Sequence, residues 1–429
     1  MEPDHASPAP YRTIEFPLAE LHKHIKEFAF IRGEKTVRLD PESPANMEAT
    51  QLLAELHDAL HDSGLQGHTL ERLLVRILFC LFAEDTGIFD LVTFTRLVQR
   101  TREDGSDLGL WLAQLFQVLN TPEPERQRNL DDDLAAFPYV NGGLFAEALP
   151  IANFTSAQRA ALLKCCLFYW ARISPAVFGS LFQGILDGKE RRQLGAHYTT
   201  ERDILKLLRA LFLDALRAEL DTILADRSTR RTERLRDFQK KLRRLRIFDP
   251  ACGCGNFLIL AYRELRRLEN ATVTALHTVA GKVQQVLNVR DLIHVDVDQF
   301  YGLEIGEWPV RIAEVGLWLA DHQCNVELAE ALGQTFRRLP LRATPTIKVA
   351  NALREDWRAF LPPHDDILIV GNPPFIGGKY QTPEQSADMA AVWGEVKSAG
   401  VLDYVTAWYL KAAQYITGDD RSGAFLRKG

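Results

Sequence analysis

The sequence predicts an α/β protein with a mostly helical first part and a doubly wound parallel sheet in the second part. Up to about residue 190, apolar residues recur at helical spacing and few stretches alternate as a strand does. From residue 246 onward, short apolar runs alternate with helical stretches, which is typical of a parallel sheet between helices. The 429 residues are 46% hydrophobic and 25% charged, so the chain can bury a large core.

Composition excludes several classes of protein. The first thirty residues lack the apolar core of a signal peptide, and no run approaches the ~18 apolar residues of a membrane-spanning helix. Six scattered cysteines do not form a secreted disulfide framework, and the C-x-C of Cys252 and Cys254 has no second pair at zinc-site spacing. We therefore expect a soluble, cytoplasmic protein without a metal site.

The helices of the first part are predicted from the spacing of its apolar residues. We expect helices over 46–60, 69–83, 91–102, 109–119 and 156–170, after a leader rich in proline and charge. A basic segment follows at 227–246, where ten Lys or Arg face only Glu233 and Asp237. Because the net charge of the chain is -6, any contact with DNA must come from such local patches. The segment is either a solvated helical face with paired charges or a surface that contacts phosphates.

Four short runs are expected to form the sheet. They cover 246–250, 299–305, 346–353 and 366–374, and helical stretches at 256–268 and 308–319 lie between them. Ligands of a doubly wound sheet bind at the carboxyl ends of its strands, so the residues that close these runs are the candidates for chemistry.

The first run ends in a glycine loop. Gly253 and Gly255 permit a tight turn and a close approach of backbone to ligand, and Asn256 can begin the next helix near its positive end. The loop lacks the third glycine of a dinucleotide site, which favours S-adenosylmethionine over NAD. The second run ends at Glu304, where a carboxylate can accept hydrogen bonds from ribose hydroxyls, although a surface glutamate after a strand is the alternative.

The fourth run ends in Asn372-Pro373-Pro374-Phe375. An asparagine side-chain oxygen and the Pro373 carbonyl can accept both hydrogens of an exocyclic amine and so localise its lone pair on nitrogen. The proline rings hold these acceptors still, and Phe375 offers a face for an extruded base. A proline-rich loop after a strand would explain the prolines alone, but not the asparagine, the aromatic and the glycine loop together.

Several motifs resemble a known family. DPACGCGNF, GLEI, NALREDW and GNPPF resemble the N6-adenine DNA methyltransferases of the γ motif order. The runs LLVRILFCLFAEDTGIF, FPYVNGGLF, ISPAVFGSLFQGILD and RRQLGAHYTTERDILKLL, at 73–208, are similar to the MmeI-like, type IIL restriction-modification proteins. The resemblance implies a Rossmann-like class I methyltransferase domain that uses S-adenosylmethionine to modify adenine in double-stranded DNA.

The resemblance also implies roles for individual residues. The catalytic residues would be Asn372, Pro373, Pro374 and Phe375. The cofactor-binding residues would be His197, Tyr198, Thr199, Asp249, Ala251, Gly253, Gly255, Glu304 and Asn351. Within the latter group, Asn351 would face the cofactor adenine, for which Asp356 is a less suitable alternative. Thr199 or Thr200 can also cap a helix in whose first turn Glu201 lies.

The implied domains are a leader (1–27), a helical spacer (28–110), a mostly helical connector (111–190) and the methyltransferase domain (191–429) with a basic helical insertion at 226–246. Two departures from the family lead to further expectations. Glu34-Lys35 and Asp40 stand in the wrong order for the family's nuclease, so no endonuclease activity is expected. The fifth strand is expected only at 422–426, which would leave the sheet incomplete and the target recognition domain missing.

The sequence is therefore consistent with three functions. The first is adenine modification in a restriction or phage-defence system by a truncated chain, or by one that works with a second chain carrying the recognition domain. The second is methylation of a protein glutamine or an RNA base, because Asn-Pro-Pro-aromatic also serves those planar nitrogens. The third is an inactive remnant that binds cofactor or DNA and needs a partner.

Overall fold

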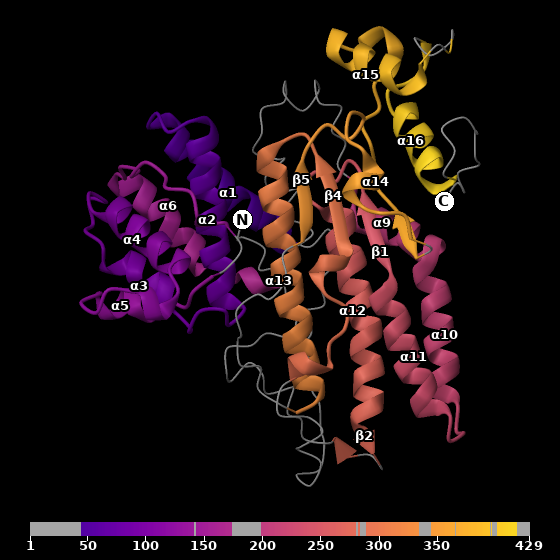
Figure 1. The fold of residues 1–429 in the computed structure, drawn as a ribbon. Helices are drawn as coiled ribbons and strands as arrows, with labels where there is room; N and C mark the ends of the chain where they lie inside the picture. The colour runs from indigo at the N-terminus through magenta and orange to yellow at the C-terminus, as the bar shows by residue number, and fades with distance from the viewer. Residues whose placement is uncertain are drawn as a thin grey trace, which may run out of the picture. The chain divides into compact units, whose positions relative to one another are not determined.

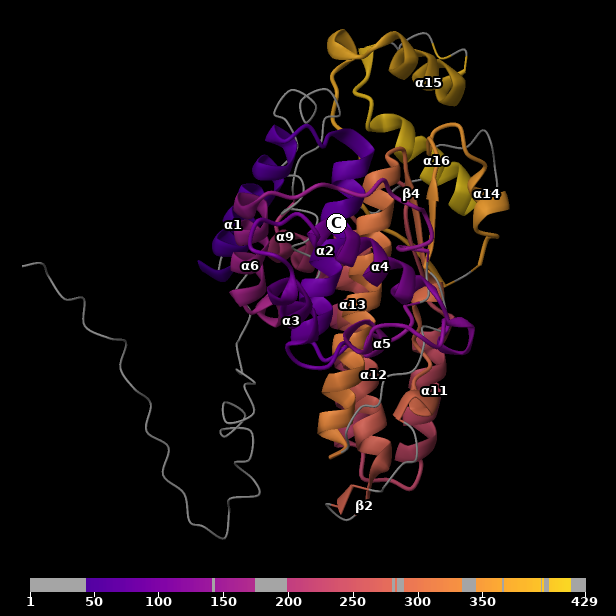
Figure 2. The same ribbon diagram turned by 90° about the vertical axis from the view of Figure 1, so that its left-hand side faces the viewer.

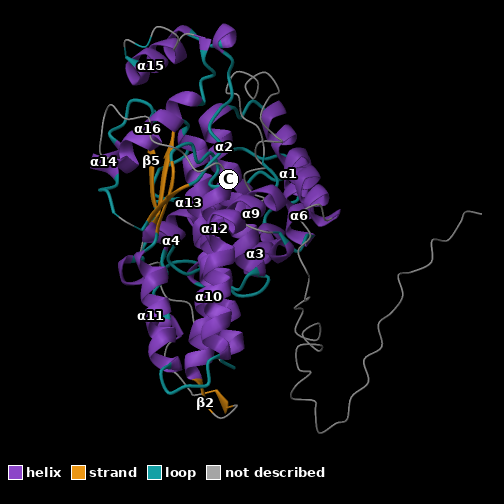
Figure 3. Cartoon of the chain, turned by 90° about the vertical axis from the view of Figure 1, so that its right-hand side faces the viewer, coloured by secondary structure: helices purple, strands orange, loops and turns teal. Residues whose placement is uncertain are grey.

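The computed structural model of this chain describes residues 44–140, 143–173, 199–279, 282–283, 289–333, 345–364, 366–394, 396 and 401–417. Helices account for most of these residues (Figures 1 and 3). Within these ranges, no helix combines the length and the apolar character that are needed to cross a bilayer.

The first part is a set of helices packed around α2 (Gly67–Asp85). Every residue of α2 from Leu73 to Ala83 is buried, as expected for a helix that is apolar on all sides. The helices that surround it are α1 (Pro44–Asp62), α3 (Thr93–Arg100), α4 (Leu108–Asn120), α5 (Asp132–Ala135) and α6 (Ser156–Leu167).

The predicted helices of this part agree with the observed ones, apart from their ends. The helix expected over 91–102 begins only at Thr93, because Val92 has a left-handed backbone (φ 64°) that no α-helix continues through. Glu84 at the end of α2 then receives the first amides of α3, from Phe94 at 2.6 Å and Thr95 at 3.1 Å. A buried carboxylate thus caps α3 and ties it to the central helix.

The second part contains the helices α9 (Glu201–Leu208), α10 (Asp214–Ala225), α11 (Arg231–Arg244), α12 (Asn256–His277), α13 (Glu307–Ala331), α14 (Trp357–Phe360), α15 (Pro383–Trp393) and α16 (Thr406–Thr417). The residue that caps α9 is Thr200, whose hydroxyl accepts the Asp203 amide. Of the two threonines considered from the sequence, Thr200 is therefore the cap.

Four parallel strands form the sheet of the second part. They are β1 (Arg246–Asp249), β4 (Phe300–Glu304), β5 (Thr346–Val349) and β6 (Ile367–Ile369), in the order β5-β4-β1-β6. Each lies inside its predicted range. The chain winds outward from β1 to β5 and then returns to the other side of β1 as β6, so the winding direction reverses between β1 and β6. A separate antiparallel pair is formed by β2 (Thr278–Val279) and β3 (Lys282–Val283).

Helices cover both faces of this sheet, as the sequence predicts. Ile247 and Phe248 are adjacent in β1 and both fully buried, but they belong to different cores because successive side chains of a strand point to opposite faces. Ile247 packs with residues of α9 to α13, and Phe248 packs with residues of α14 to α16. The sheet is therefore doubly wound.

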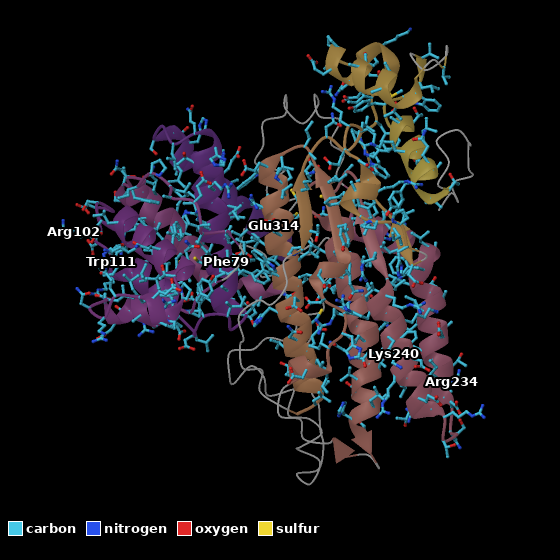
Figure 4. The ribbon with its side chains drawn as sticks, in the orientation of Figure 1. Phe79, Arg102, Trp111, Arg234, Lys240 and Glu314 are labelled. Carbon is cyan, nitrogen blue, oxygen red and sulfur yellow. The ribbon has the colours of Figure 1, made fainter. Side chains whose placement is uncertain are left out.

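The helical part and the sheet part share a core. One face of α13 packs on the sheet, and its residues Ile312, Val315 and Trp318 belong to the core of the helical part. Across this contact, Arg72 of α2 donates to Glu307 at 2.5 Å. Figure 2 shows α2 beside α13, and Figure 4 labels Glu314 on the side of α13 that faces the helical part. The two predicted parts therefore form one packed unit within 44–417.

Candidate active site and cofactor pocket

The residues predicted from the sequence gather at the carboxyl ends of the strands. Asp249 ends β1 and Glu304 ends β4, while Asn351 and Asn372 follow β5 and β6 within three residues. Because β1 and β6 are neighbours at the point where the winding reverses, the crevice between their ends is the expected ligand site of such a sheet.

The loop from β1 to α12 has the backbone that only glycine adopts easily. Gly253 has φ +52° and Gly255 has φ +82°. A side chain at Gly255 would also meet α13, since its Cβ would lie 2.7 Å from the Cβ of Ala313. The loop is thereby held close to α13, and α12 begins directly after it with its first amides directed to the strand ends.

Asn256, the first residue of α12, carries an unsatisfied group. Its side-chain oxygen is buried and accepts no hydrogen bond from the described residues. Buried polar atoms are nearly always paired, so an orphan beside the glycine loop is the kind of atom that a ligand satisfies. The loop geometry and this acceptor fit a ligand with hydrogen-bond donors, such as S-adenosylmethionine. Sequence reasoning considered Asn256 only as a helix start.

Asp249 is the most enclosed carboxylate of the site, with 1% of its surface exposed. One of its oxygens accepts the Ala251 amide at 3.0 Å, and Gly371 passes so close that a side chain there would overlap the carboxylate. Burial raises the pKa of Asp249 to about 8; the Ala251 amide opposes this shift, and the charge of Glu304 adds to it.

This pKa predicts a pH-dependent stability. The folded chain keeps the Asp249 proton up to about pH 8, whereas the unfolded chain releases it near pH 4. Between these values the folded state binds more protons, so the free energy of unfolding should fall as pH rises, by up to about 1.4 kcal/mol per pH unit, and level off above pH 8. We expect Asp249→Asn to reduce this slope in urea unfolding at pH 5 to 9. An unchanged slope would show that Asp249 ionises normally.

Glu304 links the end of β4 to the glycine loop. Its two carboxylate oxygens accept the amides of Gly253 and Gly306, each at 3.0 Å. Burial raises the pKa of Glu304, although these amide hydrogen bonds oppose the shift. A carboxylate has about four lone-pair sites, more than its backbone amide partners here use, so it can hold the loop and still accept a hydroxyl.

Asn351 is already engaged within its loop. Its side-chain oxygen accepts the Leu353 amide at 2.9 Å, and its side-chain nitrogen donates to Asp388 of α15 at 2.9 Å. Asp356, the alternative from the sequence, caps α14 through the amides of Arg358 and Ala359. Asn351 therefore lies at the strand end with a fixed orientation, while Asp356 has a helix-capping role.

Asn372 lies opposite Thr199. Its side-chain nitrogen donates to the Thr199 hydroxyl at 3.0 Å, which leaves the amide oxygen to accept. Phe375 is 50% exposed, and a residue on which a base stacks must be accessible. The structure thus brings together residues 173 positions apart, both chosen from the sequence. His197 and Tyr198 lie outside the described residues, as do Glu34, Lys35, Asp40 and the strand expected at 422–426.

The basic segment contains α11, and five of its ten Lys and Arg side chains form ion pairs. Leu235, Phe238 and Leu242 bury one face of the helix. Ion pairs join Arg234 to Asp226, Lys240 to Asp237, Lys241 to Glu219, Arg243 to Asp298 and Arg244 to Asp366, at 2.6 to 3.0 Å. Figure 4 labels Arg234 and Lys240 on this helix. The structure favours the solvated, charge-paired face over a phosphate-contacting surface.

All six cysteines are free, and Cys252 and Cys254 are buried. Among the described residues, no group of three or more His, Cys, Asp or Glu side chains could hold a metal ion. Cys254 packs into the core of the helical part, so this cysteine of the glycine loop has a packing role.

A doubly wound sheet with a glycine loop after its first strand and Asn-Pro-Pro-Phe beside it defines a Rossmann-like domain of the methyltransferase class. Family models give the same result in more detail. Residues 225–428 match the MmeI DNA-methyltransferase domain, residues 68–145 the MmeI helicase spacer domain and residues 4–63 the MmeI N-terminal domain. The chain belongs to the MmeI-like, type IIL restriction-modification family.

Individual relatives agree with this assignment. DNA methyltransferase A of Bacillus subtilis (strain 168) is 35% identical over 421 residues, which are 96% of this chain and 46% of that protein. A putative type II restriction enzyme and methyltransferase of Methanocaldococcus jannaschii is 27% identical over 296 residues, covering 58% of this chain and 24% of that protein.

Among solved structures, the type IIL restriction-modification enzyme MmeI in complex with DNA has a TM-score of 0.79 and 52% identity, over 88% of this chain and 49% of that one. The chain thus spans about half the length of the type IIL enzyme and of the Bacillus relative.

Proposed function

We propose that this chain transfers a methyl group from S-adenosylmethionine to N6 of an adenine extruded from double-stranded DNA, as the modification part of a restriction or phage-defence system. One observation carries the proposal. Where the winding of the sheet reverses, Asn372 is held by Thr199 at 3.0 Å with its amide oxygen left to accept. The relatives named as DNA methyltransferases, and the neighbour solved with DNA, support the same substrate class.

The chain's own residues would make the amine reactive. The lone pair of an exocyclic amine is delocalised into the ring and is a poor nucleophile. Acceptors at Asn372 and at the Pro373 carbonyl would bind its two hydrogens and localise the pair on nitrogen. Phe375 would hold the ring face of the extruded base, and the two prolines keep the acceptors in place. S-adenosylmethionine, when bound, supplies the electrophilic methyl group.

The other strand ends would hold the cofactor. Gly253 and Gly255 allow close approach of the backbone, Asn256 offers an unsatisfied acceptor, and Glu304 retains lone pairs for ribose hydroxyls. Asn351 stands at the end of β5, where the cofactor adenine is expected. We place the protein in the cytoplasm, where its six free thiols would stay reduced.

Glu304→Ala tests the cofactor half of the proposal. We expect at least a tenfold weaker affinity for S-adenosylmethionine, because both the ribose acceptor and the support of the Gly253 amide are lost. Isothermal titration calorimetry measures the affinity, and thermal unfolding verifies that the variant is folded. An affinity equal to that of the wild-type chain would contradict the ribose contact.

The substrate is tested by tritium transfer from labelled cofactor. We expect label in duplex DNA that contains adenine, and none in duplex whose adenines already carry an N6-methyl group. Incorporation of label into RNA or protein instead would favour methylation of an RNA base or of a protein glutamine. We also propose that the activity depends on a second chain that reads the DNA sequence. The assay is therefore repeated with the downstream half of a full-length relative added as a separate chain. If the chain binds the cofactor but transfers no methyl group, with or without the added chain, the result would favour an inactive remnant.

A further inference from the structure

Residues 403–411, which comprise the start of α16 and the turn before it, are bonded to loops at three strand ends. Trp408 donates its ring N–H to the Pro250 carbonyl, in the loop after β1, at 3.0 Å. Lys411 donates to the carbonyls of Leu353 and Glu355, in the loop after β5, at 3.0 and 2.6 Å. In Figure 1, α16 lies beside α14 near the upper ends of the strands. Trp408 and Lys411 of α16 thus hold the loops after β1 and β5, which form the cofactor side of the site.

The same segment holds the loop that carries Asn-Pro-Pro-Phe. Directly after that tetrad, the amide of Ile376 donates to the Asp403 carboxylate at 3.0 Å. The Ile376 carbonyl accepts the Tyr404 amide at 2.9 Å. These two reciprocal bonds fix the backbone directly after the tetrad, so a displacement of residues 403–404 must displace the loop.

Asp388 of α15 connects the two sides. Its carboxylate accepts Asn351 at 2.9 Å, Arg354 at 2.6 Å and the Tyr404 hydroxyl at 2.8 Å, and only 3% of the residue is exposed. A buried carboxylate is tolerated when its lone pairs are satisfied in this way. The hydrogen-bonded path therefore runs from Asn351 through Asp388 and Tyr404 to Ile376, and so joins the loop after β5 to the loop after β6.

We propose that Asp388 and Tyr404 are positioning residues that couple the cofactor loop at 350–355 to the base-binding loop at 372–376. The inference rests on the proposed function. The Asn351 side chain keeps one N–H and one oxygen lone pair for a ligand at the end of β5, and such a ligand would further restrict Asn351 and, through it, Asp388. Tyr404, bonded to Asp388 through its hydroxyl and to Ile376 through its amide, then restricts the loop that carries the acceptors at Asn372 and Pro373. Preorganising these acceptors raises the rate of transfer more than it raises affinity.

The test compares two tyrosines that each donate one hydroxyl hydrogen bond. Tyr404→Phe breaks the link to Asp388, and the matched control Tyr415→Phe breaks a bond of equal length, 2.8 Å, to the carbonyl of Leu361 at the end of α14. The first readout is hydrogen exchange of residues 371–376 with and without S-adenosylmethionine. We expect the cofactor to protect these amides in the wild-type chain and in Tyr415→Phe, but not in Tyr404→Phe.

Affinity and rate provide the second readout. Tyr404→Phe should keep its cofactor affinity within about threefold and lose about tenfold in kcat on duplex DNA at unchanged KM, a pattern that reports positioning. Asp388→Asn combined with Tyr404→Phe should lose no more protection than either change alone, since both act on one path. Equal behaviour of the two tyrosine variants would overturn the coupling. A wild-type chain that binds no cofactor would instead overturn the proposed function, and the coupling with it.

Discussion

Replacing Asn372 with alanine should abolish methyl transfer, with a loss of at least about 100-fold in kcat, and leave the affinity for S-adenosylmethionine within about threefold of wild type. The amide oxygen of Asn372 is the acceptor that the reaction needs, and its nitrogen is bonded to the Thr199 hydroxyl. Apart from Thr199, the partner of Asn372, the residues assigned to the cofactor lie at other strand ends, in the glycine loop and at Glu304 and Asn351. Rate and affinity should therefore separate.

Single-turnover transfer to duplex DNA measures the rate, and calorimetry measures the affinity. Thr199→Val is the graded comparison, because it removes the partner of the Asn372 nitrogen but keeps the acceptor. We expect Thr199→Val to lose about tenfold in the rate of transfer, because the Asn372 side chain is less restricted without this hydrogen bond. If Asn372→Ala lost rate and affinity to the same degree, the residue would belong to the cofactor pocket and not to the base.

The fold could be predicted from the sequence because its strands are short apolar runs that alternate with helical stretches. The run from Ile367 to Val370 is continuously apolar, for example, and all four strands lie inside their predicted ranges. The ends of elements depend on single backbone angles, which periodicity does not show. The left-handed Val92 that delays α3 is one example.

Part of the site could be predicted for a different reason. Ligands of such a sheet bind at strand ends, so Glu304 could be chosen by its position and Asn372 by its position and chemistry, whereas Asp249 was implied by the family resemblance. The roles of Asp388 and Tyr404 depend on how α15 and α16 fold back onto loops far away in sequence, and a lone aspartate or tyrosine has no pattern that reveals this. The basic segment illustrates the opposite case, since its charge was visible but its carboxylate partners, such as Asp298 and Asp366, were not.

The glycine loop yields the second large effect, which is on stability. Gly255→Ala should lower the free energy of unfolding by about 3 kcal/mol and abolish measurable cofactor binding. A left-handed alanine costs about 1 kcal/mol, and the new Cβ would lie 2.7 Å from that of Ala313 and push α13 from the loop. Gly253→Ala is the matched control. It has the same left-handed strain, with φ +52°, but nothing lies within 4 Å of its Cβ, so only about 1 kcal/mol should be lost.

The double variant Gly255→Ala with Ala313→Gly separates the two causes. Removing the Ala313 methyl costs about 1 kcal/mol by itself, because glycine weakens a helix. In combination it should restore about 1 to 2 kcal/mol relative to the sum of the single changes, because the contact with the Ala313 methyl is gone and only the backbone strain and a 3.1 Å contact with the Cα of residue 313 are left. Urea unfolding measures all four chains. Strict additivity would mean that contact with α13 is not what excludes a side chain, and that backbone conformation alone requires glycine at this position.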